Sequence, residues 1–314
     1  MKILITGGAG FIGSEFVTQI SEQNNTEITV VDSLTYAGSM ENLATVSNNI
    51  DFHELDIRNK SGLQKVFKDN QFDWVVNFAA ESHVDNSISG ASIFLETNIY
   101  GTLNLLELSR DYGVEKFLQV STDEVYGSLM EGFAKEEDRF KTSSPYSASK
   151  ASAEHFVQAF QETFKLPTLI VRCSNNYGPR QYPEKLIPFF IKKLIANEPV
   201  PVYGNGKNIR EWMHVSDCAR GILQVLQRGI LGEAYNISSG EFKENKEIAY
   251  TLVDILGKDP KLVEFVSDRK GHDFRYAIDS SKIRDYLGWR PEINLETGLA
   301  STVEWYVSNS SRFI

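Results

Sequence analysis

Short apolar runs alternate with longer amphipathic segments through the first half of the 314-residue chain. The apolar runs, rich in β-branched residues, predict strands at Lys2–Thr6, Glu27–Asp32, Asp51–Leu55, Trp74–Phe78, Lys116–Ser121 and Thr168–Cys173. Helical spacing predicts helices between them, at Ile12–Gln23, Ser61–Asn70, Thr97–Tyr112 and Pro145–Phe164. Since most of these strands are apolar at nearly every position, helices should cover both faces of their sheet. The pattern therefore predicts an α/β fold with a doubly wound parallel sheet.

The pattern changes after about Asn175, where clusters of turn residues separate less regularly spaced helices. These helices are expected at Leu186–Ala196, Asp217–Gln227 and Lys246–Leu256. A short run at Glu233–Ile237 is expected to form one more strand of the main sheet. We therefore predict two domains, of which the second is smaller and discontinuous. Residues 1–175, with 208–240, form the first, and residues 176–207 and 241–314 form the second.

Composition narrows the range of functions. Lys and Arg total 32 and Asp and Glu total 42, which gives a formal net charge of −10 at pH 7. Such a chain is a poor candidate for binding nucleic acid, where Lys and Arg supply most of the affinity. The two cysteines, Cys173 and Cys218, lack metal-ligand spacing, so we expect free buried thiols and no metal site. No apolar run is long enough to span a membrane, and no signal-peptide pattern precedes the first strand, so a cytoplasmic location is expected.

A glycine-rich loop joins the first strand to the first helix. Thr6–Gly13 has the sequence TGGAGFIG, with glycines spaced as in a dinucleotide-binding loop at Gly7, Gly10 and Gly13. Asp32 ends the second strand, where a carboxylate binds ribose hydroxyls and repels a 2′-phosphate. The sequence therefore predicts a Rossmann-type domain that binds NAD rather than NADP. Weaker candidates for cofactor contact follow the next two strands, at Asp56, Ile57, Phe78, Ala79 and Ala80.

Candidate catalytic residues occur in two segments of this domain. Tyr146 and Lys150 lie four residues apart in PYSASK, so a helix places both on one face. A tyrosine with a reference pKa near 10 needs a nearby cation to act as a base at neutral pH, and Lys150 can supply it. Thr122, Asp123 and Glu124 follow a buried strand, and the two carboxyl groups can converge only if the chain turns there. Carboxyl groups beside a hydride-transfer site indicate acid–base chemistry beyond oxidation.

Together these segments resemble one enzyme family over nearly the whole chain, from Lys2 to about Pro291. TGGAGFIGS, FAAESHVD, VSTDEVYG, SPYSASK, RCSNNYGPRQYPEKLIP, PVYGNGKNIREW and DRKGHDFRYAID are similar to motifs of the dTDP-glucose 4,6-dehydratases, within the extended short-chain dehydrogenase/reductase superfamily. The resemblance implies a hydro-lyase that converts a nucleoside-diphosphate glucose, with dTDP-glucose the expected substrate, into its 4-keto-6-deoxy derivative. A hydride would pass from C4 to C6 through bound NAD. The expected setting is deoxysugar biosynthesis, such as that of dTDP-rhamnose.

Roles of individual residues follow from the same resemblance. Tyr146 would take the proton of the 4-hydroxyl, assisted by Lys150 and Thr122, while Asp123 would protonate the departing 6-hydroxyl and Glu124 would remove the C5 proton. Matching cofactor contacts are Phe11, Ile12, Asp32, Ser33, Leu34, Thr35, Asp56, Ile57, Phe78, Ala79, Ala80, Thr97 and Asn176, besides the loop glycines and the Tyr146–Lys150 pair. Matching substrate contacts are Ser82, His83, Thr122, Asn175, Glu184, Lys185, Leu186, Ile187, Pro188, Pro201, Val202, Tyr203, Arg210, Asn245, Arg269 and His272. The second domain would thus bind the sugar nucleotide, and related enzymes imply a homodimer formed by Thr97–Tyr112 and Pro145–Phe164.

Two alternatives share part of this residue set. A sugar-nucleotide 4-epimerase needs the glycine loop, Tyr146 and Lys150, but no acid and base at C5 and C6. A non-catalytic dinucleotide-binding protein needs the loop alone. The chain also departs from the family, because Asn86 stands where members often have arginine and the chain is shorter than many relatives. These patterns do not distinguish a thymine from a uracil base on the substrate.

Overall fold

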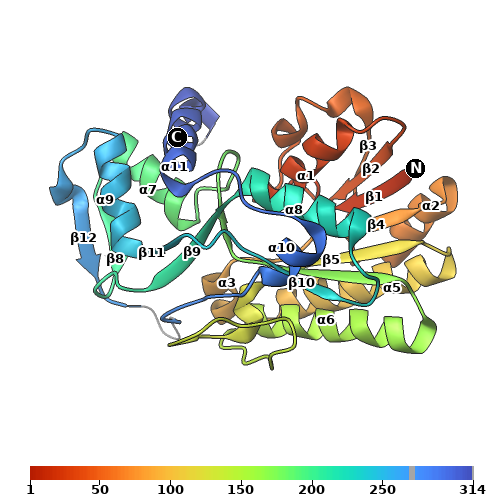
Figure 1. Cartoon of the computed structure of the whole chain (residues 1–314). Coiled ribbons are helices and arrows are strands. Elements are labelled where there is room, and N and C mark those ends of the chain that lie inside the picture. Colours follow the sequence, from red (N-terminus) through yellow and green to blue (C-terminus); the bar gives the residue numbers. More distant parts are fainter. Residues whose placement is uncertain (269–272, 313–314) are drawn as a thin grey trace.

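A parallel sheet forms the centre of the larger part of the molecule (Figure 1). The computed structural model describes residues 1–268 and 273–312, and within them seven strands form this sheet in the order β10-β6-β5-β4-β1-β2-β3. Their bounds are β1 Lys2–Thr6, β2 Glu27–Asp32, β3 Ile50–Glu54, β4 Trp74–Asn77, β5 Lys116–Thr122, β6 Thr168–Cys173 and β10 Ala234–Ile237. All neighbouring pairs are parallel. The chain therefore has the predicted Rossmann-type sheet, with its strand order reversing between β1 and β4.

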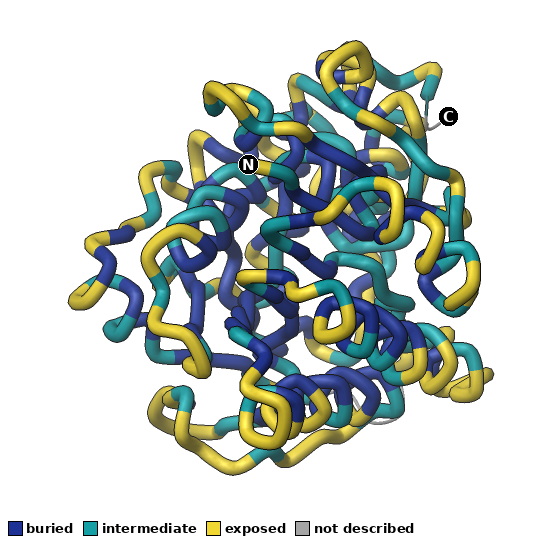
Figure 2. The backbone as a smooth tube through the Cα atoms, turned by 90° about the vertical axis from the view of Figure 1, so that its right-hand side faces the viewer, coloured by how far each residue is buried: buried dark blue, intermediate teal, exposed yellow. Residues whose placement is uncertain are grey.

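Helices cover both faces of the sheet because successive strand residues point in opposite directions. In β1, Ile3 and Ile5 pack into one hydrophobic cluster with α1 (Phe11–Ser21) and α8 (Val215–Arg228). Leu4 packs into a second cluster that contains residues of α2 (Lys60–Asn70), α5 (Thr102–Asp111) and α6 (Pro145–Phe164). The side chains of Ile3, Leu4 and Ile5 are all fully buried. Figure 2 shows mostly buried backbone toward the centre of the molecule and mostly exposed segments around its edge.

The predicted helix at Thr97–Tyr112 is present, but it begins earlier and its first part is π-helical. The chain forms α3 (Val84–Ser89), α4 (Ser92–Phe94), a π-helical segment η3 (Leu95–Gly101) and only then α5. Asn98 in η3 accepts a hydrogen bond from the Glu81 amide at 2.8 Å and donates to the Glu81 carbonyl at 3.0 Å. A π-helical turn within a helix is frequently found at a functional site, and this one attaches the helix to the loop that follows β4.

The smaller part of the chain surrounds a hydrophobic cluster of its own. Its helices are α7 (Leu186–Ile195), α9 (Asn245–Ile255) and α11 (Leu295–Ser308), which lie together to the left in Figure 1. Short strands accompany them: β7 Asn175–Tyr177 and β11 Phe242–Glu244 each pair with β9 Ile209–His214, and β8 Val200–Tyr203 pairs with β12 Val263–Val266. The remaining short elements are α10 Ser281–Leu287, η1 Met40–Leu43, η2 Ser47–Asn49, η4 Asp123–Tyr126, η5 Pro260–Leu262 and η6 Ser310–Arg312.

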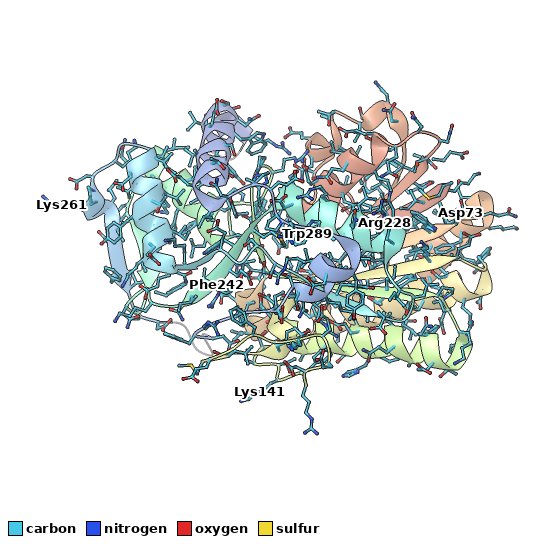
Figure 3. All side chains as sticks on the ribbon, viewed as in Figure 1. Asp73, Lys141, Arg228, Phe242, Lys261 and Trp289 are labelled. Carbon is cyan, nitrogen blue, oxygen red and sulfur yellow. The ribbon has the colours of Figure 1, made fainter. Side chains whose placement is uncertain are left out.

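The chain crosses between the two parts more than once. After β7 and β8 it returns through β9 and α8 to β10, which pairs with β6 at the edge of the large sheet. Trp289, labelled beside α8 in Figure 3, donates its indole N–H to the Asp217 carbonyl at 3.2 Å. The discontinuous second domain and its boundaries remain a prediction. Within residues 1–268 and 273–312, no helix is both long and apolar enough to cross a membrane.

Candidate active site

The glycine loop lies directly against the end of β4. Gly7 has φ +70°, and a Cβ built there would come within 2.5 Å of the Ala79 amide nitrogen. A Cβ on Gly13 would come within 2.2 Å of the Gly7 carbonyl oxygen. Because α1 starts at Phe11, its N-terminus opens toward the same space. Only glycine fits at Gly7 and Gly13, and the backbone they leave bare forms a cradle suited to a pyrophosphate.

Asp32 organises the neighbouring loop at the end of β2. Its Oδ2 accepts a hydrogen bond from the Ala9 amide and its Oδ1 one from the Leu34 amide, both at 2.9 Å. Burial raises the pKa of Asp32, and these two amide hydrogen bonds oppose the rise. Leu34 adopts φ +46°, a strained conformation for a residue with a side chain, which the hydrogen bond to Asp32 supports. The carboxylate is thereby held at the edge of the cleft.

Helix α6 presents Tyr146 and Lys150 to the same cleft. Ser144 caps this helix in a capping box with Ser147, and Pro145 occupies its first turn. The Lys150 ammonium donates to the Val120 carbonyl of β5 at 2.7 Å. Burial lowers the pKa of Lys150 to about 8. Burial and the charge of Glu124 raise the pKa of Tyr146, against a hydrogen bond with Thr122.

The chain leaves β5 after Thr122 and turns, as the carboxylate pair requires. Asp123 and Glu124 are the first two residues of the 3₁₀ turn η4. The Thr122 hydroxyl caps the turn by accepting a hydrogen bond from the Glu124 amide at 3.2 Å. Gly127 ends the turn with φ +72°. Adjacent residues on a strand would face opposite sides of the sheet. In this turn both acids instead line one cleft.

The two acids have different surroundings. Asp123 is 3% exposed, and its Oδ2 has no hydrogen-bond partner among the described residues. Burial, followed by the nearby charges of Glu124 and Glu211, raises the pKa of Asp123 well above its ordinary value. Glu124 is less buried, and the Tyr276 hydroxyl lies 3.5 Å from its Oε2. Asp123 is therefore suited to donate a proton and Glu124 to accept one.

One cleft of about 320 Å³ contains these groups together. Of the predicted cofactor contacts, all but Leu34 line it: Gly7, Gly10, Phe11, Ile12, Gly13, Asp32, Ser33, Thr35, Asp56, Ile57, Phe78, Ala79, Ala80, Thr97, Tyr146, Lys150 and Asn176. The predicted substrate contacts that line it are Ser82, Thr122, Asn175, Glu184 and Lys185. The Lys185 ammonium donates to the Ser82 carbonyl at 2.9 Å. The cleft thus joins a cofactor half to the start of a substrate half.

The other predicted substrate contacts lie outside the lining of this cleft. They are His83, Leu186, Ile187, Pro188, Pro201, Val202, Tyr203, Arg210 and Asn245, while Arg269 and His272 fall outside the described residues. The side chains of Ile187 and Val202 belong to the core of the smaller part, so they can offer a ligand only their backbone. Arg210 and Asn245 are buried polar residues of that part. Their roles remain predictions.

Sequence patterns missed several residues of the site. Arg58, Glu81, Cys173, Gln181 and Tyr182 also line the cleft. The Tyr36 hydroxyl donates to Glu184 at 3.2 Å, and its ring packs edge-on against Tyr182, so two loops meet over the cleft. Glu81 and Arg58 follow strands β4 and β3 in the same way as the predicted contacts, and this placement was the signal available for them. Tyr36 and Tyr182 lie in loops without such a signal.

Comparison with known proteins adds four findings. The family model described as GDP-mannose 4,6 dehydratase matches residues 4–302. The dTDP-glucose 4,6-dehydratase of Neisseria gonorrhoeae is 44% identical over 99% of this chain and 97% of its own. The solved structure of DesIV, a dTDP-glucose 4,6-dehydratase from Streptomyces venezuelae with NAD and dTDP bound, has a TM-score of 0.96 and 46% identity, covering 100% of this chain and 99% of its own. A UDP-glucose 4-epimerase from Thermotoga maritima has a TM-score of 0.93 and 33% identity, covering 99% and 100%.

Proposed function

The chain belongs to the GDP-mannose 4,6 dehydratase family, and from this we propose that it dehydrates dTDP-glucose, with bound NAD, to the 4-keto-6-deoxy sugar nucleotide. The family model and the similar full-length relatives differ in the sugar nucleotide that they name. We choose dTDP-glucose because the Neisseria gonorrhoeae relative and DesIV are both named dTDP-glucose 4,6-dehydratase. Each matches this chain over almost its whole length. The observation that carries the proposal is the turn η4, which brings Asp123 and Glu124 to the same cleft as Tyr146 and Lys150.

The cleft fits NAD by its shape and its donors. The glycine cradle accepts a pyrophosphate, and Asp32 at the end of β2 favours unphosphorylated ribose hydroxyls. The buried Asn176 Oδ1, which lacks a hydrogen-bond partner in the part of the chain that the structure describes, offers a further acceptor in the lining. When bound, NAD supplies a hydride acceptor for C4 and a hydride donor for C6.

Tyr146 acts as the base at the sugar 4-hydroxyl. A phenol in a buried site holds its proton strongly unless a cation stabilises the phenolate. Lys150, one turn further along α6, provides that cation while it remains protonated. Thr122 hydrogen-bonds Tyr146 and can orient the sugar hydroxyl toward it. Removal of this proton accompanies oxidation at C4.

Asp123 and Glu124 carry out the elimination. A ketone at C4 acidifies the hydrogen at C5, and Glu124 accepts that proton. Asp123, kept protonated by its burial, donates a proton to the C6 hydroxyl, which leaves as water. An epimerase needs neither proton transfer, so this pair favours a dehydratase over the similarly folded 4-epimerase. A protein that only binds a dinucleotide would need neither the Tyr146–Lys150 pair nor the two acids.

Isotope transfer tests the proposal. Substrate deuterated at C4 should yield a product with deuterium at C6, whereas C5 should take its hydrogen from solvent through Glu124. Free NADH should not accumulate in solution. Parallel assays with dTDP-glucose and UDP-glucose determine the preferred base. Recovery of a C4 epimer, or stoichiometric NADH release, would rule out the dehydratase activity.

The same proposal includes a homodimer. Large apolar side chains are exposed on neighbouring helices: Ile88 of α3, Leu95 and Tyr100 of η3, and Phe156 and Phe164 of α6. The faces of η3 and α6 are in contact within the chain, so these residues can form one apolar surface for a second copy. Sedimentation at micromolar concentration should show a dimer, and a monomer would refute it. The cytoplasmic location also stays a prediction.

A further inference from the structure

A buried ion pair lies one helical turn beyond Lys150. Glu154 follows Lys150 by four residues in α6, so the two side chains share a face of the helix. The Arg172 guanidinium on β6 binds the Glu154 carboxylate through Nε, at 2.9 and 3.2 Å, and through Nη2 at 2.8 Å. The two side chains are 2% and 0% exposed. Burial of two charges is costly, and no step of the proposed reaction uses either group.

Arg172 also reaches the turn that carries the two acids. Its Nη1 donates to the Tyr126 hydroxyl at 2.5 Å and to the Glu136 carbonyl at 2.9 Å. Tyr126 is the last residue of η4, and its own hydroxyl donates to Asn236 of β10 at 2.9 Å. The guanidinium lies over the Tyr126 ring, 5.1 Å from its centroid. Arg172 therefore connects the helix of Tyr146 and Lys150 with the turn of Asp123 and Glu124.

We propose that the Glu154–Arg172 pair is a positioning element for the dehydratase reaction. The pair fixes the position of α6 relative to η4, and it keeps the Glu154 carboxylate on the same helix face as the Lys150 ammonium. This inference rests on the proposed function, since it assigns the oxidation to α6 and the elimination to η4. Neither Glu154 nor Arg172 lines the cleft, so both act through their neighbours.

The electrostatic part of this role concerns the charge on Lys150. The ammonium is held against the Val120 carbonyl, and the side chain is 5% exposed. Burial lowers its pKa, whereas the Glu154 carboxylate on α6, followed by the Cys173 thiol on β6, acts in the opposite direction. Glu154 in turn faces Arg172 of β6 and Tyr126 of η4. Loss of the Glu154 charge should therefore let Lys150 release its proton at a lower pH.

The variant Glu154→Gln tests this role, because it removes the charge and keeps the shape. The dependence of kcat on pH is measured with dTDP-glucose. The loss of activity at high pH should begin about one pH unit lower than in the wild type. At the pH where the wild type has lost half of its activity, the kcat of the variant should therefore be roughly tenfold below its own maximal value. If the wild-type chain itself fails to convert the substrate, the proposed function is wrong. If the wild type is active and the folded variant keeps its profile, only the positioning role is refuted.

Two further variants separate charge from folding. Asp217→Asn removes another buried, ion-paired carboxylate, bound to Arg220 on α8, and should lower thermal stability without moving the pH profile. An equal shift in Asp217→Asn would overturn the proposal.

The double variant Glu154→Gln/Arg172→Met removes both charges and should fold if the single variant does not. It should retain a smaller shift in the same direction. If neither form folds, or the double variant shows no shift, the pair is only structural and the proposal fails.

Tyr126→Phe tests the connection to η4. It removes the hydroxyl between Arg172 and Asn236 and leaves the Glu154 charge in place. The pH profile should stay unchanged, while elimination slows relative to oxidation. Bound NADH, followed at 340 nm during one turnover, should reach a level about tenfold higher than in the wild type. An unchanged NADH level in this variant would show that the position of η4 does not depend on its hydrogen bond with Arg172.

Discussion

The cofactor half and the substrate half of the cleft are built differently. The cofactor half consists mainly of backbone and short side chains at the ends of β1, β2 and β4, neighbouring parallel strands of one sheet. The substrate half begins with loop residues and the short strand β7, whereas the predicted substrate contacts on β8 and β9 lie outside the cleft lining. Parallel strands end at one edge, so sequence spacing alone places the first group. The second group depends on how separate elements pack, which spacing does not specify.

The largest effect is expected from the cofactor half. In Gly7→Ala the new Cβ would meet the Ala79 backbone at 2.5 Å, and the φ of +70° would be strained as well. Neither backbone can give way cheaply, so we expect loss of copurifying NAD and of all activity. Gly113→Ala is the matched control, with φ +69° and nothing within 4 Å of the new Cβ. It should lower the free energy of unfolding by only about 1–2 kcal/mol and retain NAD. Similar behaviour of the two variants would show that contact at Gly7 is unimportant.

The next effect separates the two half-reactions. Glu124→Gln should still oxidise C4 but not remove the C5 proton, so turnover should fall by roughly 10²–10⁴-fold and bound NADH should accumulate. Asp123→Asn should chiefly impair loss of water from C6. In Tyr146→Phe oxidation itself fails, so no NADH should form. Absorbance at 340 nm in a single turnover distinguishes these cases. Near wild-type turnover in both acid variants would mean that the pair is structural.

Several parts of the molecule could be predicted from the sequence because local rules determine them. The strands Lys2–Thr6, Glu27–Asp32 and Thr168–Cys173 have the predicted bounds, since buried parallel strands have an apolar pattern. Helix α6 also matches, with Ser144 and Pro145 marking its start. The turn after Thr122 was required by the two adjacent acids.

Other features depend on contacts between distant residues. The π-helical segment η3 depends on the hydrogen bonds of Asn98 to Glu81, which periodicity does not reveal. The contact of Tyr36 with Glu184 joins residues 148 positions apart. The ion pair of Glu154 with Arg172 joins a helix to a strand whose charges look ordinary in sequence. These are the places where packing, rather than local pattern, determines the site.

A smaller effect is expected for cofactor choice. Asp32→Ala removes the carboxylate that would repel a 2′-phosphate, so the preference for NAD over NADP should narrow by about one to two orders of magnitude. The same change also frees the Ala9 and Leu34 amides, so NAD itself should bind less tightly. Asp51→Ala, on the exposed side of β3, should leave the preference unchanged. Dissociation constants for both cofactors provide the measurement. Equal use of NAD and NADP by the wild type would remove Asp32 from this role.

The smallest effect should come from the substrate half. The Arg210 guanidinium donates a hydrogen bond to the Asp273 carbonyl at 2.9 Å and lies 4.4 Å from the centroid of the Tyr276 ring. The Tyr276 hydroxyl in turn contacts Glu124, so the Arg210 charge lies close to the candidate catalytic acids. Arg210→Lys keeps the charge but loses the planar fork that suits a phosphate. KM for dTDP-glucose should rise about tenfold, equivalent to about 1.4 kcal/mol, with kcat and bound NAD nearly unchanged. Arg275→Lys is the control, because Arg275 also donates to backbone carbonyls, at Leu129 and Gly132, but is not among the predicted substrate contacts. It should change KM by less than about twofold. An equal rise in KM in both variants would mean that Arg210 stabilises the packing of the smaller part of the chain and does not bind the substrate diphosphate.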